Sequence, residues 1–216
     1  MKLGWDAILF DLDGTLVDTT SDLRAALNKL CEDRGIDTVT QEDFLSYTGQ
    51  GVNKILERFL GISQKDSEFK DIKNRFLSFY TDVDHGQSDF FPGIRGIIAN
   101  IEGLVVPWGI VTGKWRSLTI PLLDHINLNC PCVVCGDDVL HPKPSPDSLL
   151  KAADILNSDP SKCIYIGDGL CDYEAASACN MEFLGVLWGY QRDVLLERAV
   201  SNLVSSAKEL SDFLFK

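Results

Sequence analysis

Short apolar runs recur along the chain, and each of them is too short to form a helix. Most are rich in β-branched or aromatic residues, which favour the extended backbone of a buried sheet. We therefore predict five buried strands, at Ala7–Phe10, Gly109–Val111, Cys132–Cys135, Cys163–Ile166 and Phe183–Trp188.

The segments between these runs have the period of amphipathic helices. One apolar stripe lies within residues 94–101 and another within residues 149–156. The second stripe is preceded by a helix start signal, with Ser145 as the N-cap and Pro146 in the first turn. Strands that alternate with helices favour a parallel sheet covered on both faces. The pattern therefore predicts an α/β fold.

A helical block interrupts this alternation after the first strand. Three apolar helical faces follow one another within residues 23–30, 52–59 and 69–79, with no convincing strand among them. We therefore predict a small helical domain over residues 19–83, inserted into an α/β core made of residues 1–18 and 84–216. The chain would cross between the two at Asp18–Thr20 and at about Asp84–Pro92.

Composition indicates a folded protein that avoids polyanions. The 216 residues are 45% hydrophobic and 24% charged, which argues against disorder. The net charge of −12 repels nucleic acid and anionic membrane surfaces, so neither is expected as a partner. The same field would repel a phosphate substrate, so a site for one needs local cations.

Cysteine usage and the N-terminal segment favour a cytoplasmic location. The seven cysteines are odd in number and scattered, which fits free thiols better than a disulfide framework. The first apolar run is soon interrupted by Asp11 and Asp13, unlike a signal peptide. The longest apolar stretch is too short to span a bilayer. A zinc site at Cys130, Cys132 and Cys135 is disfavoured, because no fourth ligand is obvious and a predicted strand covers two of them.

The first predicted strand ends in paired carboxylates. In open parallel sheets, ligands collect at the carboxyl ends of the strands. Asp11 and Asp13 lie there in the segment Asp-Leu-Asp-Gly-Thr, and Gly14 permits a turn that aims both inward. Such a pair can act as nucleophile and proton donor–acceptor. A solvated acidic turn is the alternative for a bare pair of aspartates, but the full segment after a strand favours function.

Three further segments add complementary chemistry. Thr112 and Gly113 follow the second strand and could bind phosphate oxygens, although a simple turn is the alternative. Lys143 lies in a Pro-rich loop that could present its ammonium group to a phosphate, or leave it exposed to solvent. Asp168 and Asp172 follow another strand, as oxygen ligands for Mg²⁺ or as helix caps.

The four segments in this order resemble the motifs of the haloacid dehalogenase-type phosphatase superfamily. The resemblance covers nearly the whole chain, including the helical cap inserted after the first motif and the return to the core at Pro92-Gly93. It implies a Rossmann-like parallel sheet with helices on both faces and an all-helical cap. Three other segments look most like phosphoglycolate phosphatases and their near relatives: Tyr47–Gly51, Leu122–His125 and Gly185–Tyr190.

The resemblance implies a phosphoric monoester hydrolase that uses Mg²⁺. Asp11 would attack phosphorus to form an aspartyl-phosphate, and Asp13 would be the general acid and then the general base. The metal would be held by Asp11, the Asp13 carbonyl oxygen and Asp168. Asp172 would lie beside the metal and act through a bound water or by a hydrogen bond to one of the ligands.

The transferred phosphoryl group would be gripped by Thr112, Gly113 and Lys143. The family often has Asn before Lys114, and Ser and Asn at positions 169 and 171. Because Gly169 and Cys171 lie beside the metal loop, metal affinity is the property most open to change by these departures. Cys171 also suggests sensitivity to thiol oxidation.

Substrate choice is expected from the inserted domain, because the core grips only the phosphoryl group. The candidate contacts are Tyr47, Thr48, Gly49 and Gln50. The expected partner is a small phosphorylated metabolite, with phosphoglycolate favoured and a sugar phosphate, amino-sugar acid phosphate, pyrophosphate or nucleotide as alternatives. A phosphomutase or a non-catalytic phospho-acceptor module is disfavoured. The oligomeric state, monomer or homodimer, and the pathway stay open.

Overall fold

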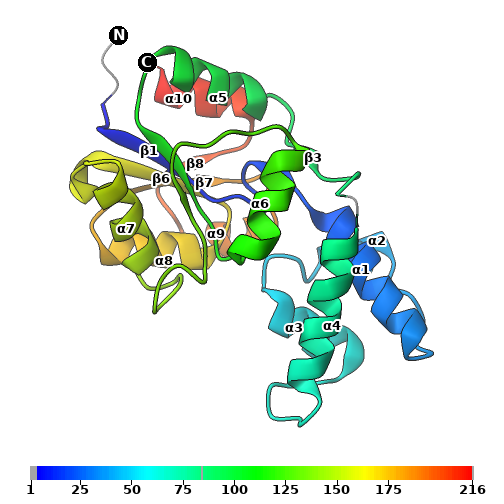
Figure 1. Ribbon diagram of the computed structural model, residues 1–216. Coiled ribbons are helices and arrows are strands. Elements are labelled where there is room, and N and C mark those ends of the chain that lie inside the picture. Colours follow the sequence, from blue (N-terminus) through cyan, green and yellow to red (C-terminus); the bar gives the residue numbers. More distant parts are fainter. Residues whose placement is uncertain (1–3, 84, 216) are drawn as a thin grey trace. The chain divides into compact units, whose positions relative to one another are not determined.

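The computed structural model describes residues 4–83 and 85–215, which form two compact units (Figure 1). The core unit contains the chain up to Asp18 and from Asp89 onward, and the insert unit is Thr19–Ser88. The second boundary falls inside the predicted crossing, five residues after the predicted start of the core at Asp84, which itself lies outside the described residues.

A six-stranded parallel sheet forms the centre of the core unit. Its strand order is β5-β4-β1-β6-β7-β8, with β1 between β4 and β6. Phe10 at the end of β1 aligns with Ile110 of β4 and Ile166 of β6, so the residues after these strands lie at one edge. The strands are β1 (Ala7–Phe10), β4 (Trp108–Val111), β5 (Val133–Val134), β6 (Cys163–Gly167), β7 (Glu182–Val186) and β8 (Leu203–Val204). The predicted α/β fold with a parallel sheet is confirmed.

Helices cover both faces of this sheet (Figure 1). One apolar layer joins the sheet to α5 (Ile94–Gly103), α6 (Arg116–His125) and α10 (Ala207–Leu214). The other joins it to α7 (Asp147–Ile155), α8 (Leu170–Ala178) and α9 (Arg192–Glu197). A single 3₁₀ turn at Pro160–Lys162 leads into β6. The two layers make the first strand, β1, buried on both faces.

Two sequence expectations about these elements are wrong in detail, and one short pair of strands was missed. Ser145 does not cap α7: the N-cap is Pro146, and the Ser145 hydroxyl instead donates to Asp147 Oδ1 at 2.9 Å. The last predicted strand ends at Val186 rather than Trp188, since Trp188 lies in the following turn. A short antiparallel pair, β2 (Val17–Asp18) and β3 (Asp89–Phe90), was not predicted because each strand has two residues.

The regular elements among the described residues of the insert unit are all helices: α1 (Thr20–Asp33), α2 (Gln41–Leu45), α3 (Val52–Leu60) and α4 (Phe69–Asp82). Helices α1 and α4 pack against each other, and their buried side chains include Leu27, Leu30 and Phe76. This confirms the all-helical insert that the apolar periodicity predicted.

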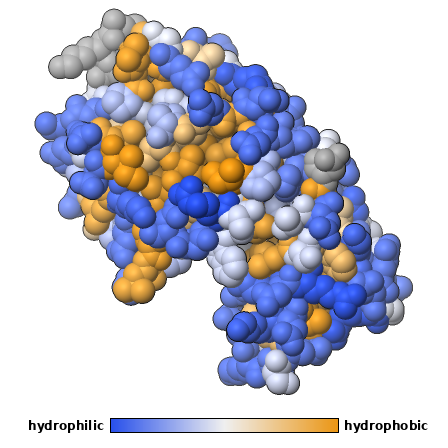
Figure 2. All heavy atoms as spheres, in the orientation of Figure 1, coloured by the Kyte–Doolittle hydropathy of each residue, from blue (hydrophilic) through white to orange (hydrophobic). Residues whose placement is uncertain are grey.

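The visible surface of both units is largely hydrophilic. Figure 2 shows hydrophilic side chains over most of this face of each unit, interrupted by apolar side chains mainly on the core unit. Within residues 4–83 and 85–215, no helix combines the length and the hydropathy that a membrane span requires.

Candidate active site

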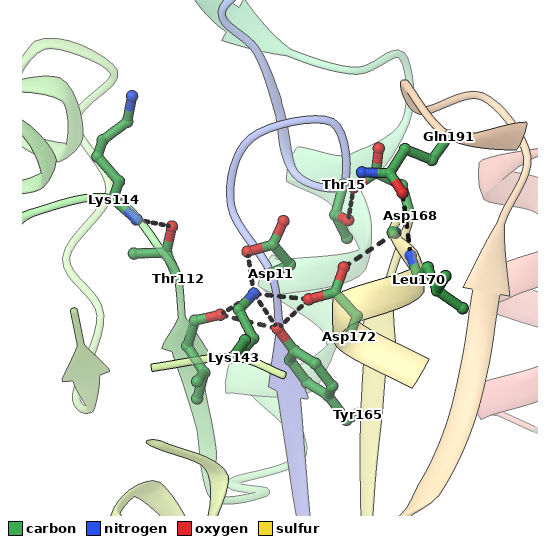
Figure 3. A network of polar contacts seen from close by, with 12 residues as sticks. Asp11, Thr15, Thr112, Lys114, Lys143, Tyr165, Asp168, Leu170, Asp172 and Gln191 are labelled. Atoms are coloured by element: carbon green, nitrogen blue, oxygen red, sulfur yellow. Dashed lines mark hydrogen bonds and ion pairs between the residues drawn. The ribbon is translucent and has the colours of Figure 1, made fainter. Parts of the chain in front are cut away.

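The candidate site lies at the carboxyl edge of the three central strands. Asp11 follows β1, Thr112 follows β4, and Asp168 follows β6, each directly after the last residue of its strand. The parallel register places these strand ends side by side. Lys143 comes from the loop between β5 and α7, and its side chain points into the same cluster (Figure 3). The sheet topology therefore gathers residues that are more than 150 positions apart, as between Asp11 and Asp168.

Asp11 is a buried carboxylate held by one ammonium group. Its side chain Oδ1 accepts a hydrogen bond from Lys143 Nζ at 2.8 Å, and its backbone N–H donates to the Ile166 carbonyl oxygen at 2.8 Å. Burial raises the pKa of Asp11 from 3.8 to about 7, against the opposing effect of Lys143, and the charge of Asp172 raises it further. Because burial makes the Asp11 carboxylate hard to ionise, further positive charge next to it would favour its charged form.

Lys143 lies at the centre of the network (Figure 3). Besides Asp11, its Nζ is 2.6 Å from Asp172 Oδ1, 2.7 Å from Tyr165 Oη and 3.2 Å from the Val111 carbonyl oxygen. Burial would lower the pKa of Lys143, but the charges of Asp11 and Asp172 outweigh it and hold this pKa well above its usual range. These contacts favour the charged form of the ammonium group and fix it beside Asp11.

Asp172 supports Lys143 and the start of α8. Its Oδ1 accepts from Lys143 and lies 3.0 Å from Tyr165 Oη, while its Oδ2 accepts the Gly169 N–H at 2.9 Å. Both carboxylate oxygens are thus engaged by protein groups. The expectation that Asp172 acts through water or behind the metal ligands stays a prediction.

Asp168 is held by the loops on both sides of it. Its Oδ2 accepts the Tyr190 N–H at 2.6 Å, and its Oδ1 lies 3.4 Å from the Thr15 hydroxyl. Burial raises the pKa of Asp168 well above its usual range, and the charges of Asp11 and Asp172 add to this shift. Two buried carboxylates with raised pKa values, Asp11 and Asp168, therefore share the site.

The donor set fits a hard divalent cation. Asp11, Asp168 and Asp172 each offer an oxygen, and these oxygens lie within 4.8 Å of one another. Carboxylate oxygens are the ligands that Mg²⁺ and Ca²⁺ prefer. Lys143 alone leaves the three carboxylates with excess negative charge, which a divalent cation would offset. Asp11, Asp168 and Asp172 are thus the candidate ligands, and the leading role of Asp11 and Asp168 among them stays a prediction.

Asp13 lies beside this cluster and pairs with a second lysine. Its carboxylate Oδ1 is 3.1 Å from Lys114 Nζ. The next residue, Gly14, has a φ of 87° and approaches Asp168 so closely that a Cβ there would lie 2.4 Å from the carboxylate Oδ2. The glycine thus permits both the turn and the contact. The role of the Asp13 side chain as acid and base stays a prediction, as does that of its carbonyl oxygen as a metal ligand.

The segment after β4 forms a compact turn. The Thr112 hydroxyl oxygen accepts the Lys114 N–H at 3.1 Å, and the Lys114 carbonyl oxygen accepts the Gly136 N–H at 3.0 Å. The Thr112 side chain is buried, and a Cβ on Gly113 would meet nothing within 4 Å. The open backbone at Gly113 fits the predicted approach of a phosphate, which stays a prediction.

Residues of the insert unit that were expected to contact substrate are engaged within their own unit. The Thr48 hydroxyl is buried and donates to the Phe44 carbonyl oxygen at 2.9 Å. The Tyr47 ring packs edge-on against Phe59, and the Arg58 guanidinium lies over it at 5.1 Å. Gly49 and Gln50 complete this turn, Gly49 with a φ of 89°. A substrate contact by these four residues stays a prediction.

Sequence reasoning missed three contributors to the network. Tyr165 lies in β6 and reaches Lys143 and Asp172, but as one aromatic residue in a buried strand it carried no separate signal. Lys114 follows the Thr-Gly turn and was noted only as a family residue. Gln191, whose side-chain Oε1 accepts the Leu170 N–H at 3.1 Å, comes from a distant loop. Each of these contacts joins residues from separate elements of the fold, so the structure is needed to find them.

Cys171 is a partly buried free thiol next to Asp172. Burial raises its pKa to about 12, and the charge of Asp172 contributes to the shift. The thiolate is the reactive form of cysteine, so a thiol that stays protonated at neutral pH reacts slowly. Redox sensitivity at Cys171 stays a prediction.

Replacing Gly189 with Ala should damage the site through Asp168. A Cβ at this position would lie 2.3 Å from Asp168 Cβ and 2.5 Å from the Gly14 carbonyl oxygen. We expect activity to fall sharply and the free energy of unfolding to drop by roughly 1–3 kcal/mol. The matched control is Gly96→Ala in α5, where a Cβ meets nothing within 4 Å and should stabilise the helix by about 0.5–1 kcal/mol. Equal behaviour of the two variants in activity and in urea unfolding would contradict the proposed crowding.

Comparisons with known proteins bear on the family and the fold of the chain. A family model described as haloacid dehalogenase-like hydrolase matches residues 8–186. A phosphoglycolate phosphatase from Xanthomonas campestris pv. campestris is 31% identical over 89% of this chain and 92% of its own length. An N-acetylmuramic acid 6-phosphate phosphatase from Pseudomonas putida is 28% identical over 85% of this chain and 83% of its own. A crystal structure of a protein from Lactobacillus delbrueckii subsp. bulgaricus has the same fold, with a TM-score of 0.87 at 24% identity, and covers 99% of this chain and 100% of that one.

Proposed function

This chain belongs to the haloacid dehalogenase-like hydrolase family, and from that premise we propose that it is a Mg²⁺-dependent phosphatase whose nucleophile is Asp11. The observation that carries the proposal is the Lys143 ammonium group, fixed 2.8 Å from the Asp11 carboxylate at the end of the central strand. A carboxylate aimed by a fixed cation, in a buried site with oxygen ligands for a metal, suits attack on a phosphate ester.

In the first half of the reaction, an Asp11 carboxylate oxygen attacks phosphorus. The bond between that oxygen and phosphorus forms as the bond from phosphorus to the leaving oxygen breaks. Asp13 gives its proton to the leaving oxygen, so that an alcohol departs. Lys143 stays beside Asp11 throughout, because Tyr165 and Asp172 hold it there. It offsets the negative charge that the incoming phosphate brings to an acidic protein.

In the second half, water attacks the phosphorus of the aspartyl-phosphate. Asp13, now deprotonated, takes a proton from the water as the bond between phosphorus and Asp11 breaks. Inorganic phosphate leaves and both aspartates return to their starting forms. Thr112 and Gly113 would bind the oxygens of the phosphoryl group in both halves, at the turn that follows β4.

A bound Mg²⁺ would neutralise the buried carboxylates and the phosphate oxygens and so make phosphorus open to attack. Asp11 and Asp168 would hold it, with the Asp13 carbonyl oxygen as a further ligand and Asp172 behind them. Support comes from the donor set itself, three carboxylates whose candidate oxygens lie within 4.8 Å of one another, two of them in contact with Lys143.

We propose a small phosphorylated acid as the substrate, with phosphoglycolate favoured. The support is the likeness to the Xanthomonas phosphoglycolate phosphatase along most of both chains. An amino-sugar acid phosphate is the second candidate, because the Pseudomonas relative named for N-acetylmuramic acid 6-phosphate is similar over 85% of this chain. The inserted helical domain, predicted over residues 19–83, would select between these substrates through Tyr47 and its neighbours. A cytoplasmic location also stays a proposal.

The proposed function is tested by phosphate release. We expect the purified protein to release phosphate from 4-nitrophenyl phosphate with Mg²⁺ and to lose this activity when EDTA removes the metal. A panel containing phosphoglycolate, N-acetylmuramic acid 6-phosphate, sugar phosphates, pyrophosphate and nucleotides then ranks substrates by kcat/KM. Absence of Mg²⁺-dependent phosphate release from every compound would reject the proposal. A higher value for the amino-sugar acid phosphate would shift the substrate to the second candidate.

Stability of the metal-free protein should depend on pH through Asp11. Its pKa is about 7 in the folded protein against 3.8 as the ordinary value, so the folded state binds the extra proton between them. This contribution to stability is fully present below pH 3.8 and is lost as the pH rises through about 7. We expect the free energy of unfolding in EDTA to fall by roughly 2–4 kcal/mol across this window.

The measurement is urea unfolding at several pH values, with Asp11→Asn as the reference. Because asparagine does not titrate, the variant should show a shallower pH dependence than the wild type in EDTA. Added Mg²⁺ should reduce the difference, since the cation favours the charged carboxylate. Parallel curves for the two proteins without metal would contradict a raised pKa for Asp11.

A further inference from the structure

A second buried lysine contacts the site at a different carboxylate. Lys114 Nζ lies 3.1 Å from Asp13 Oδ1, and the side chains of Lys114 and Asp13 are 7% and 22% exposed. Lysine side chains are almost never this deeply buried unless they are paired. The contact is therefore a built feature of the core unit, unlike the exposed ion pair of Lys208 with Asp212 on α10.

The backbone of Lys114 is anchored on both sides. Its N–H donates to the Thr112 hydroxyl at 3.1 Å, and its carbonyl oxygen accepts the Gly136 N–H at 3.0 Å. A Cβ on Gly136 would lie 2.4 Å from the Gly113 carbonyl oxygen, so the two loops are in close contact here. The Cα of Lys114 is therefore held in place, directly after Thr112 and Gly113, the residues predicted to bind phosphate.

The backbone of Asp13 is fixed as well. Asp13 and Val17 form a β-bridge, and the Gly14 N–H donates to the Val17 carbonyl oxygen at 2.9 Å. With the backbone held, the direction of the Asp13 carboxylate depends on rotation of its side chain. The ammonium group of Lys114 is 3.1 Å from that carboxylate and favours one direction.

The two lysines of the site thus serve different aspartates. Lys143 contacts Asp11 and Asp172, and Lys114 contacts Asp13. If Asp11 is the nucleophile and Asp13 the proton donor–acceptor, each of the two catalytic carboxylates has its own fixed cation.

We propose that Lys114 is a positioning residue: it holds the Asp13 carboxylate in the direction needed for proton transfer and thereby allows hydrolysis of esters with poor leaving groups. The inference rests on the proposed function. An alkyl leaving group needs a proton from Asp13 when its bond to phosphorus breaks, whereas a nitrophenolate is stable without one. Loss of Lys114 should therefore harm alkyl phosphates selectively.

The test compares two substrates in variants of the full chain with Mg²⁺. In Lys114→Met, kcat/KM for an alkyl phosphate such as glycerol phosphate should fall about 100-fold, and that for 4-nitrophenyl phosphate less than about fivefold. Lys114→Gln should give the same selectivity and serves if the Met variant folds poorly. Lys208→Met removes an exposed ion pair and should leave both values unchanged.

Equal losses for the two substrates, or no loss, in the folded Lys114 variants would overturn the inference. A second measurement uses Asp13→Asn: in that background Lys114→Met should no longer change the ratio of the two kcat/KM values, and a persistent change would also overturn it. A wild-type protein inactive on both esters would instead reject the proposed function. An active wild type whose Lys114 variants keep its substrate ratio would reject only the role of Lys114.

Discussion

Replacing Asp11 with Asn should lower kcat/KM by at least about 10⁴-fold, because an amide cannot form the aspartyl-phosphate. The fold should remain intact, since the amide has nearly the same shape and its oxygen can still accept from Lys143. Far-ultraviolet circular dichroism and urea unfolding check the fold, and phosphate release with Mg²⁺ checks the activity.

The matched control for this substitution is Asp124→Asn. Asp124 lies on the exposed surface of α6 in the same unit, so its loss of charge should change activity little. Near-normal turnover by Asp11→Asn would exclude Asp11 as the nucleophile. Equal losses in the Asp11 and Asp124 variants would show that the effect arises from charge and not from chemistry.

Replacing Lys143 with Met should have the second largest effect, on activity and on stability together. The substitution leaves Asp11 and Asp172 without the ammonium group that contacts both. Breaking a buried ion pair by removing one partner costs roughly 3–5 kcal/mol of stability. We also expect kcat to fall about 10³-fold, as when a fixed electrostatic donor is removed from an active site.

Mg²⁺ separates these two consequences of the Lys143 substitution. High Mg²⁺ should recover part of the lost stability, because the cation offsets the same carboxylates, but it should not restore kcat. The matched control is Lys151→Met, since Lys151 is an exposed lysine of α7 that donates to the Asp138 carbonyl oxygen at 2.8 Å. A Lys143→Met protein as stable and as active as Lys151→Met would contradict the role of Lys143 in the site.

The sequence was sufficient to predict five of the six strands of the sheet and the aspartates that follow two of them. Buried strands of parallel sheets are continuous apolar runs, and the residue after each run then falls at the carboxyl edge. Asp11 and Asp168 follow this rule directly. Lys143 comes from a loop, and the order of the motifs in the family resemblance, rather than periodicity, made it a candidate.

The details that the sequence did not predict depend on contacts distant along the chain. Tyr165 joins the network because β6 lies beside β1, which turns an ordinary strand residue toward Lys143. Lys114 pairs with Asp13 across about a hundred positions of sequence, a distance that local pattern reading does not cover. Strand β8 was missed because two residues are too few to show a period.

The central claim is that a phosphoryl group becomes covalently attached to Asp11. It is tested most directly by acid-quenching the Asp13→Asn variant during turnover of 4-nitrophenyl phosphate with Mg²⁺, followed by peptide mass spectrometry. Without its general base this variant should release the phosphoryl group slowly, so the intermediate should accumulate. We predict one phosphoryl group on the peptide that contains Asp11, absent when Asp11→Asn is added. A phosphoryl group on another residue, or none during rapid turnover, would contradict the account.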